Sequence, residues 1–287
     1  MRKTRERIFN FIIKILSLIS LFLLAFIIIF IFRESLSFFM EVPILKFVSG
    51  RDWNPLDSPD KLSILPIIAG TIYTSLVGII IALPIGVGFS VVLSSYTSDN
   101  MRRIIRGIVD ILAGIPSVVY GFIGLLVLVK FFEIRFSFPT GESILAGGII
   151  LSIMMLPYII STCDESMEKV YKEHSQQSNA LGVSKSYMIR NLILPKSKKC
   201  ILAAVVLALG RGMGETMAVM MVIGNAPLMP RLLDKGQTIP SLIALEMGMA
   251  EVGSLHYHAL FASGFILMII LIVINIALHF VKLKIEL

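Results

Sequence analysis

The sequence predicts an all-α polytopic membrane protein with six transmembrane helices. Of its 287 residues, 56% are hydrophobic and 16% are charged, against roughly 45–50% and 25% in an ordinary soluble domain. The mean hydropathy is +0.88, and six long runs of the chain carry almost no charge. An apolar excess of this size needs lipid around it, so these observations exclude an ordinary soluble enzyme.

The first hydrophobic run is Ile15–Phe32, which contains 18 residues without a charge. As a helix it is about 27 Å long, close to the hydrocarbon thickness of a bilayer. A cleaved signal peptide is the alternative, because the residues ahead of the run are basic, but no small-x-small cleavage site follows Phe32. We therefore expect a retained anchor. Residues 1–49 are predicted to hold a basic tail, this helix and the start of a periplasmic loop.

Five further runs are predicted to cross the membrane, because each is apolar over a length that spans the hydrocarbon core. Residues 50–287 are predicted to form one domain that contains these five helices and a polar loop at 163–200. The five runs are Ile64–Leu93, Gly107–Val129, Ser143–Thr162, Ile201–Gly224 and Ala259–Val281.

The distribution of Lys and Arg predicts the orientation. With the N-terminus inside, the inner segments hold 17 of these residues and the outer loops 8, and the last of the 26, Arg211, lies within a run. Cytoplasmic segments are the more positive, so both termini and the loop 163–200 are predicted to be cytoplasmic. This explains the net charge of +7 without nucleic acid. Cys163 and Cys200, at the edges of that loop, are expected to be reduced thiols.

The sequence lacks the motifs of the common hydrolases. No Gly-Lys dipeptide occurs, so there is no Walker A loop and any ATP is expected to be hydrolysed by a separate subunit. Neither G-x-S-x-G nor H-E-x-x-H is present. His256 and His258 could bind a metal, but no other Cys or His is near them in the sequence, which favours a surface role. We predict no catalytic residue, no metal site and no cofactor.

Three charged residues lie inside the predicted membrane runs: Asp110, Arg211 and Glu215. A charge at a helix centre costs roughly 2.5–3.5 kcal/mol on insertion scales, so each should face protein or water. Asp110 follows three arginines and is expected to form a structural ion pair with one of them. The arginines are Arg102, Arg103 and Arg106.

Arg211 and Glu215 are four residues apart, which would place them on one helix face near the middle of the membrane. A self-neutralising ion pair is one interpretation. The other is an anion pathway, because a guanidinium suits bidentate capture of an oxyanion and a neighbouring carboxylate tempers the affinity so that the anion also leaves. The residues alone favour the anion pathway only slightly.

The loop 163–200 contains the most specific motif of the chain. Ser184 is expected to cap a short helix that ends at Pro195. The spacing of Ala180-Leu181-Gly182 to the later residues of the loop resembles the coupling loop of ABC importer permeases. The resemblance implies contact with an ATPase, although Gln176, Gln177 and Ser178 replace the common Glu-Ala-Ala. The implied contact residues are Gln176, Gln177, Ser178, Ala180, Leu181, Gly182, Leu192 and Pro195.

Three other segments resemble PstC-type permease subunits of phosphate importers. They are Trp53-Asn54-Pro55, the stretch Ile115–Gly121, and Gly210–Val219 followed by Gly224-Asn225. The resemblance implies the type I ABC importer permease fold and a location in the cytoplasmic membrane of a prokaryote. It also implies a phosphate pathway lined by Arg211, Glu215, Thr216, Asn225 and Ser117.

The same resemblance implies partners. These are a PstA-type permease subunit, two PstB-type ATPase subunits that bind the ATP and Mg, and a PstS-type phosphate-binding protein. Three alternatives stay open: a permease for another oxyanion such as sulfate or molybdate, a passive anion channel or membrane sensor, and an intramembrane enzyme. The last is the weakest, because the charged residues and histidines form no recognisable catalytic set.

Overall fold

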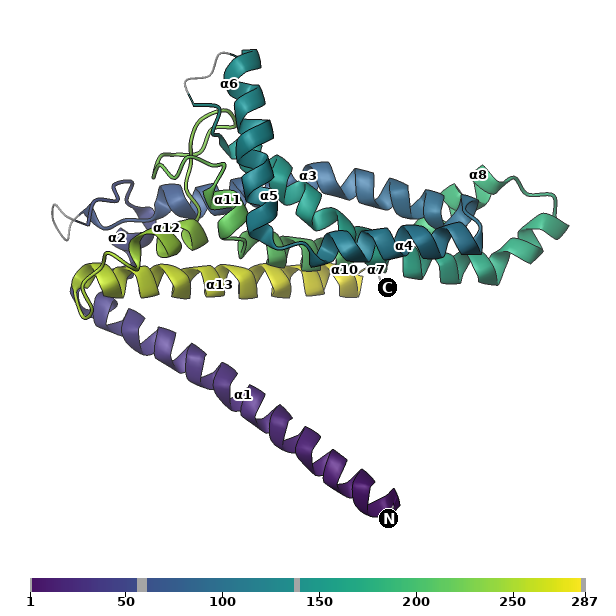
Figure 1. Ribbon diagram of the computed structural model, residues 1–287, viewed down its shortest axis with the longest axis horizontal. Coiled ribbons are helices and arrows are strands. Elements are labelled where there is room, and N and C mark those ends of the chain that lie inside the picture. Colours follow the sequence, from purple (N-terminus) through teal and green to yellow (C-terminus); the bar gives the residue numbers. More distant parts are fainter. Residues whose placement is uncertain (1, 56–60, 137–139, 285–287) are drawn as a thin grey trace.

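The computed structural model describes residues 2–55, 61–136 and 140–284, and the side chains within 9–281 of these ranges. The described residues form helices and two isolated bridges but no strand, which confirms the all-α class (Figure 1). The helices are α1 Arg2–Glu41, α2 Ile44–Ser49, α3 Leu65–Tyr96, α4 Asp99–Gly114, α5 Ser117–Ile123, α6 Lys130–Phe136, α7 Ile144–Ala180, α8 Lys185–Met188, α9 Leu194–Lys196, α10 Lys198–Met213, α11 Met217–Met220, α12 Ile239–Glu246 and α13 Leu255–Lys284. Two π-helical segments, Gly124–Val129 and Ile189–Ile193, join α5 to α6 and α8 to α9.

Five helical segments are long and apolar enough to cross a membrane, which confirms a polytopic protein. They correspond to the first, second, fourth and sixth predicted runs, of which the second and fourth begin one residue before the helix, at Ile64 and Ser143. The five segments are Phe9–Glu41, Leu65–Tyr96, Ser117–Phe136, Ile144–Ala180 and Leu255–Val281.

The third predicted run, Gly107–Val129, is wrong as one straight helix. The chain leaves α4 at Gly114 and turns at Ile115 and Pro116, whose φ and ψ are −65°, 129° and −57°, 138°. Proline has no N–H to donate and disfavours the α conformation at the residue before it. The sequence on both sides is apolar, but α5 therefore points away from the direction of α4 (Figure 1).

The fifth predicted run, Ile201–Gly224, is not one helix either. Helix α10 ends at Met213, is 16 residues long, and is separated from the four-residue α11 by Gly214, Glu215 and Thr216. Because α10 is shorter than the other membrane segments, the predicted count of six long helices is not reproduced within the described residues.

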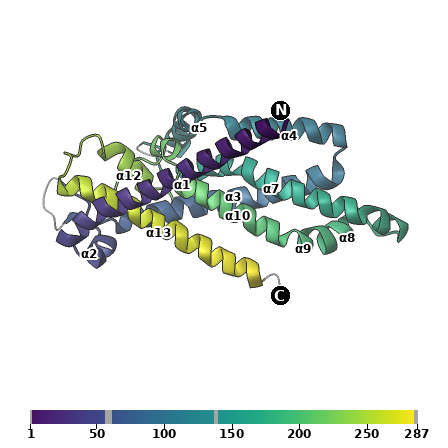
Figure 2. The ribbon, with the colours of Figure 1, turned by 90° about the horizontal axis from the view of Figure 1, so that it is seen from below.

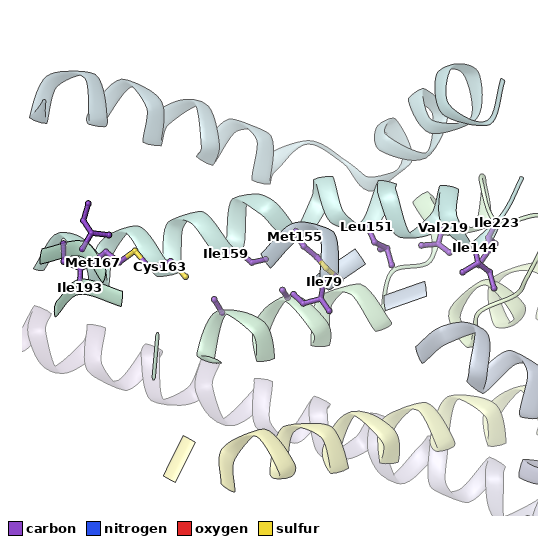
Figure 3. Packing of buried hydrophobic residues seen from close by; sticks show 14 of the residues in the cluster. Ile79, Ile144, Leu151, Met155, Ile159, Cys163, Met167, Ile193, Val219 and Ile223 are labelled. Carbon is purple, nitrogen blue, oxygen red and sulfur yellow. The ribbon is translucent and has the colours of Figure 1, made fainter. Parts of the chain in front are cut away.

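The main hydrophobic core lies between α3, α7 and α10. One face of α7 supplies a continuous apolar stripe, and Figure 3 shows its side chains directed toward the neighbouring helices. Apolar side chains at spacings of three, four and seven residues share a helix face, so this long helix is held along most of its length. The labelled α7 residues of the stripe are Ile144, Leu151, Met155, Ile159, Cys163 and Met167.

Helix α1 leaves this core at an angle. It contacts α13 near one end of the molecule, where Phe30 lies edge-on to Phe261 at 5.5 Å between ring centroids, and then diverges (Figure 1). A second core near that end contains Phe38, Phe47 and Trp53. Figure 2 places α2 at one end of the bundle and α8 at the opposite end.

Candidate functional site

The predicted coupling loop forms an exposed tip at the end of α7. Leu181 is 80% exposed. Gly182 has φ +66°, and a Cβ on it would meet no atom within 4 Å. Three backbone hydrogen bonds close the tip: the N–H groups of Leu181, Gly182 and Val183 donate to the carbonyls of Gln177 (3.1 Å), Asn179 (3.1 Å) and Ser178 (2.9 Å). The left-handed backbone favours glycine, and the exposed leucine in front of it is free to enter a groove of another protein.

The residues around this tip divide into two groups. Gln176, Gln177 and Ala180 are exposed, whereas Ser178 is 6% exposed and faces the protein. Ser184 caps α8 as expected, because its side chain accepts from the Tyr187 N–H at 3.3 Å.

The second half of the loop differs from the prediction. Pro195 does not end the helical segment, because it lies in α9, and α10 begins only two residues after α9. Proline is tolerated in the first turn of a helix, where its missing N–H has no partner to lose. Leu192 is half-buried and packs on the main core. Leu192 therefore holds the loop against the bundle, while Leu181 is the apolar residue that projects.

A lysine at the start of α8 fixes that helix to the bundle. Lys185 Nζ lies 5.0 Å from the ring centroid of Tyr96 in α3 and 5.8 Å from that of Tyr171 in α7. A cation near an aromatic face within about 6 Å is attracted by the ring quadrupole. The coupling segment is thus attached to both helices of the main core.

Asp110 does not form the predicted ion pair. It is exposed on α4, and the structure gives it no ion pair within the described residues. Arg102 and Arg106 instead contact Asp164 and Glu168 of α7 at 2.6–2.9 Å. Sequence reasoning missed this cluster, although each pair has the i, i+4 spacing that places two side chains on one helix face.

Arg211 lies in the last turn of α10 and forms no ion pair with Glu215. Its Cζ is 4.6 Å from the ring centroid of Tyr158 in α7, and the side chain is exposed in the isolated chain. Glu215 lies beyond the end of α10, and its Oε1 accepts from the Ala218 N–H of α11 at 3.3 Å. The predicted placement of both residues on one helix face is wrong, because the helix ends at Met213 before the chain reaches Glu215.

The fold brings the two motif segments around Ser117 and Arg211 together. Gly121 in α5 packs against α11, where an added Cβ would lie 2.9 Å from Ala218 Cα. Tyr120, one turn from Ser117, is close enough to Tyr158 and Arg211 for an electrostatic interaction. Its hydroxyl donates to the Leu112 carbonyl at 2.9 Å. The Arg211 guanidinium therefore lies at the contact between α10 and α7, with Tyr120 of α5 in the same region.

Thr216 and Asn225 belong to the loops that flank α11. Thr216 Oγ1 donates to the Gly214 carbonyl at 3.4 Å. Asn225 has φ +47° and follows Gly224 at φ +88°. Its Nδ2 donates to the Met220 carbonyl at 2.7 Å, and its buried Oδ1 has no hydrogen-bond partner in the described part of the chain. Thr216 thus bonds to the backbone next to Glu215, and Asn225 bonds to the last residue of α11.

At the opposite end of the molecule, two Glu–His pairs join α13 to α12 and α1, and the two histidines lie in the first turn of α13 and not in a loop as the sequence suggested. Trp53 Nε1 donates to Glu246 at 3.0 Å, and His256 Nε2 lies 2.8 Å from the same carboxylate. His258 Nδ1 lies 3.1 Å from Glu34 Oε2. Each histidine thus has its own carboxylate from another helix, an arrangement that serves packing of α13 against α12 and α1.

Comparison with known proteins identifies the sequence family. Residues 78–286 match the family described as binding-protein-dependent transport system inner membrane component. The chain is 36% identical over 226 residues to the probable ABC transporter permease protein YqgH of Bacillus subtilis, covering 78% of this chain and 73% of that protein. It is 34% identical over 260 residues to the phosphate transport system permease protein PstC of Mesorhizobium japonicum, covering 84% and 79%.

A solved structure shows the same fold. The MetNI methionine ABC transporter, in inward facing conformations, contains a chain that superposes with a TM-score of 0.56 at 18% sequence identity. The match covers 77% of this chain and 94% of the other. The helical arrangement is therefore that of an ABC importer permease.

Proposed function

This chain belongs to the family of binding-protein-dependent transport system inner membrane components, and we propose that it is the permease subunit through which inorganic phosphate crosses the cytoplasmic membrane. The observation that carries this proposal is Arg211, a guanidinium at the contact between α7 and α10 whose charge Glu215 does not neutralise. The similarity to PstC proteins supports phosphate as the anion.

The surroundings of Arg211 suit a transported oxyanion. Tyr158 holds the plane of the guanidinium by a cation–π contact, which leaves its N–H groups free to donate. A tetrahedral oxyanion can accept two hydrogen bonds from a guanidinium. The positive charge also offsets part of the free energy that the anion loses when it leaves water. Glu215, nearby but bonded to the α11 backbone, limits the affinity so that the anion is released.

Energy is supplied from outside this chain. The exposed tip at Leu181 and Gly182 enters a groove of a PstB-type ATPase subunit, two copies of which bind and hydrolyse ATP with Mg. Helix α7 continues from Ala180 at the tip to Tyr158 at the Arg211 site without interruption. Movement of the ATPases therefore reaches the anion site along one rigid helix. The chain itself is a non-catalytic subunit.

The remaining partners follow from the same assembly. A PstA-type permease subunit completes the membrane pathway, and a PstS-type protein delivers phosphate on the periplasmic side. Helices α2 and α12 mark one side of the molecule in Figure 1, and α8 marks the other. The N-terminus on α1 and the C-terminus on α13 both point away from α2 and α12, toward the side of α8. This supports the orientation with both termini and the coupling loop in the cytoplasm.

The experiment that tests the function is phosphate uptake in a strain lacking its own permease subunit, complemented with this chain and its partner subunits. We expect ATP-dependent uptake that arsenate competes with and sulfate does not. Uptake of sulfate in preference to phosphate would establish another oxyanion as the substrate. Uptake that continues without the ATPase subunits would establish a passive channel.

A further inference from the structure

Two arginines of α4 and two carboxylates of α7 form a cluster, here called the Arg–carboxylate quartet: Arg102, Arg106, Asp164 and Glu168. Lys172 of α7 contacts Glu168 from outside the quartet, at 2.7 Å. Arg102 lies 2.6 Å from Asp164 and 2.7 Å from Glu168. Arg106 lies 2.6 Å and 2.9 Å from the same two carboxylates. Each arginine therefore bridges both acids, and each acid receives both arginines.

The quartet is shielded on one side. The side chains of Arg102 and Asp164 are 5% and 1% exposed, whereas that of Arg106 is 39% exposed. Burial lowers the pKa of Arg106, but the hydrogen bond and the charge of Asp164 outweigh it and raise that pKa above its usual value. The guanidinium therefore stays charged at every physiological pH, and the quartet is not a pH switch.

Net stability is a weak reason for such a cluster, because desolvation of buried ion pairs cancels much of their attraction. The best-attested use of buried charges is to fix the register of neighbouring helices. The spacing here fits that use. The two arginines are one helical turn apart on α4, and the two carboxylates are one turn apart on the facing helix α7.

The flanking residues penalise a slip in either direction. Helices α4 and α7 run antiparallel, since Val109 of α4 packs near Ile160 of α7 while Arg102 is paired with Glu168. Lys172, one turn beyond Glu168, already contacts that carboxylate at 2.7 Å in the observed register, and a shift of one turn toward it would take Arg102 away from the buried Asp164. A shift the other way would place Arg106 opposite the apolar Ile160.

Helix α4 depends on this contact. Its main packing partner is α7, but an apolar groove of about 500 Å³ lies between its middle part and α3, α5 and α7. At its far end, the Leu112 carbonyl accepts from Tyr120 of α5 at 2.9 Å. The quartet fixes one end of α4 to the helix that bears the coupling tip, and the other end meets the Arg211 site.

We infer that the Arg–carboxylate quartet locks α4 and α7 into one register, so that displacement of the coupling tip moves both helices as one body and reaches α5. The inference rests on the proposed function. Its four members are positioning residues that act through α4 and do not contact the anion.

The first test measures coupling in the purified complex, reconstituted with its ATPase and partner permease. The double variant Arg106→Gln with Glu168→Gln removes one positive and one negative charge and leaves the buried Arg102–Asp164 pair, while the exposed Lys172 loses its contact with Glu168. We expect assembly to persist and ATP hydrolysed per phosphate transported to rise about fivefold or more, the lower end of ordinary allosteric coupling. Arg103→Gln is the matched control, because Arg103 is on the same helix and contacts Asn100 and the Asp99 carbonyl outside the quartet.

The second test measures distance between spin labels and does not depend on which anion is carried. With Cys163 and Cys200 replaced, labels at Ile111 of α4 and Glu173 of α7, both exposed, should keep one distance with and without ATP. A reference pair at Glu173 and Phe280 should report the movement of α7 relative to α13. In the double variant, the first distance distribution should broaden.

The outcomes separate this inference from the proposed function. A complex that fails to carry phosphate contradicts the proposed function, while the ATP-dependent label distances still test the quartet. An unchanged coupling ratio in the double variant overturns the quartet's role, as does a wild-type α4–α7 distance that changes with ATP. If the double variant and both single variants all fail to assemble, the quartet is a folding element and the inference is also wrong.

Discussion

Arg211 of α10 lies over the ring of Tyr158 of α7, with 4.6 Å between the guanidinium carbon and the ring centroid. This relationship joins the one arginine within the predicted membrane runs to the helix that ends in the coupling tip. It also replaces the salt bridge that the spacing of Arg211 and Glu215 suggested, because α10 ends between those two residues. The following predictions start from this arrangement.

Arg211→Gln should reduce phosphate uptake by about tenfold or more with the complex assembled, since a hydrogen bond to a charged group contributes about 1.5–3 kcal/mol. Glu215→Gln keeps an oxygen that can accept from the Ala218 N–H and should retain substantial uptake. The double variant should behave like Arg211→Gln. Uptake assays on membranes with matched amounts of complex provide the measurement, and full uptake by the double variant would remove Arg211 from the pathway.

Tyr158→Leu should raise the KM for phosphate uptake, because the guanidinium loses a cation–π contact of about 0.5–2 kcal/mol. Tyr158→Phe keeps the ring and is the matched control. The KM and the maximal rate are measured together. Equal KM values for the Leu and Phe variants would show that the ring does not position Arg211.

Gly182→Asp should abolish uptake while the protein still inserts, because the new side chain is strained at φ +66° and brings a charge into the docking groove. Co-purification of the ATPase and uptake are measured side by side. The control is Ser186→Asp, which places the same charge on the exposed side of α8. Normal uptake by Gly182→Asp would exclude this loop from coupling.

Gly121→Val should lower the thermal stability of the purified complex, because its Cβ would lie 2.9 Å from both Ala218 Cα and Met221 Sδ. Overpacking of this kind costs typically about 1–3 kcal/mol. Gly88→Val is the control, since a Cβ there meets nothing within 4 Å. An unchanged melting temperature for Gly121→Val would indicate that α5 and α11 separate readily.

A single cysteine at position 198, in a chain with Cys163 and Cys200 replaced, should be labelled by an impermeant thiol reagent only in inverted membrane vesicles. Lys198 is exposed at the start of α10, on the side that the 17 to 8 distribution of Lys and Arg assigns to the cytoplasm. Arg51→Cys in the outer loop should show the opposite pattern. Labelling of position 198 in intact cells would reverse the topology.

The sequence by itself determined the membrane class, four of the membrane helices, the Ser184 cap and the family. These features depend on local information: an apolar run over the length of a bilayer, a hydroxyl before a helix, and motifs read in order along the chain. Such signals need no knowledge of which residues lie opposite one another.

Only the tertiary structure decided the breaks at Pro116 and Gly214 and the partners of the charged residues. Apolar composition is the same on both sides of a break, so hydropathy cannot separate a bent segment from a straight one, and backbone conformation decides it. Arg102 and Arg106 pair with Asp164 and Glu168, about 60 positions away, and Arg211 with Tyr158. Long-range pairing depends on how helices pack, because a side chain selects the partner that packing brings within reach.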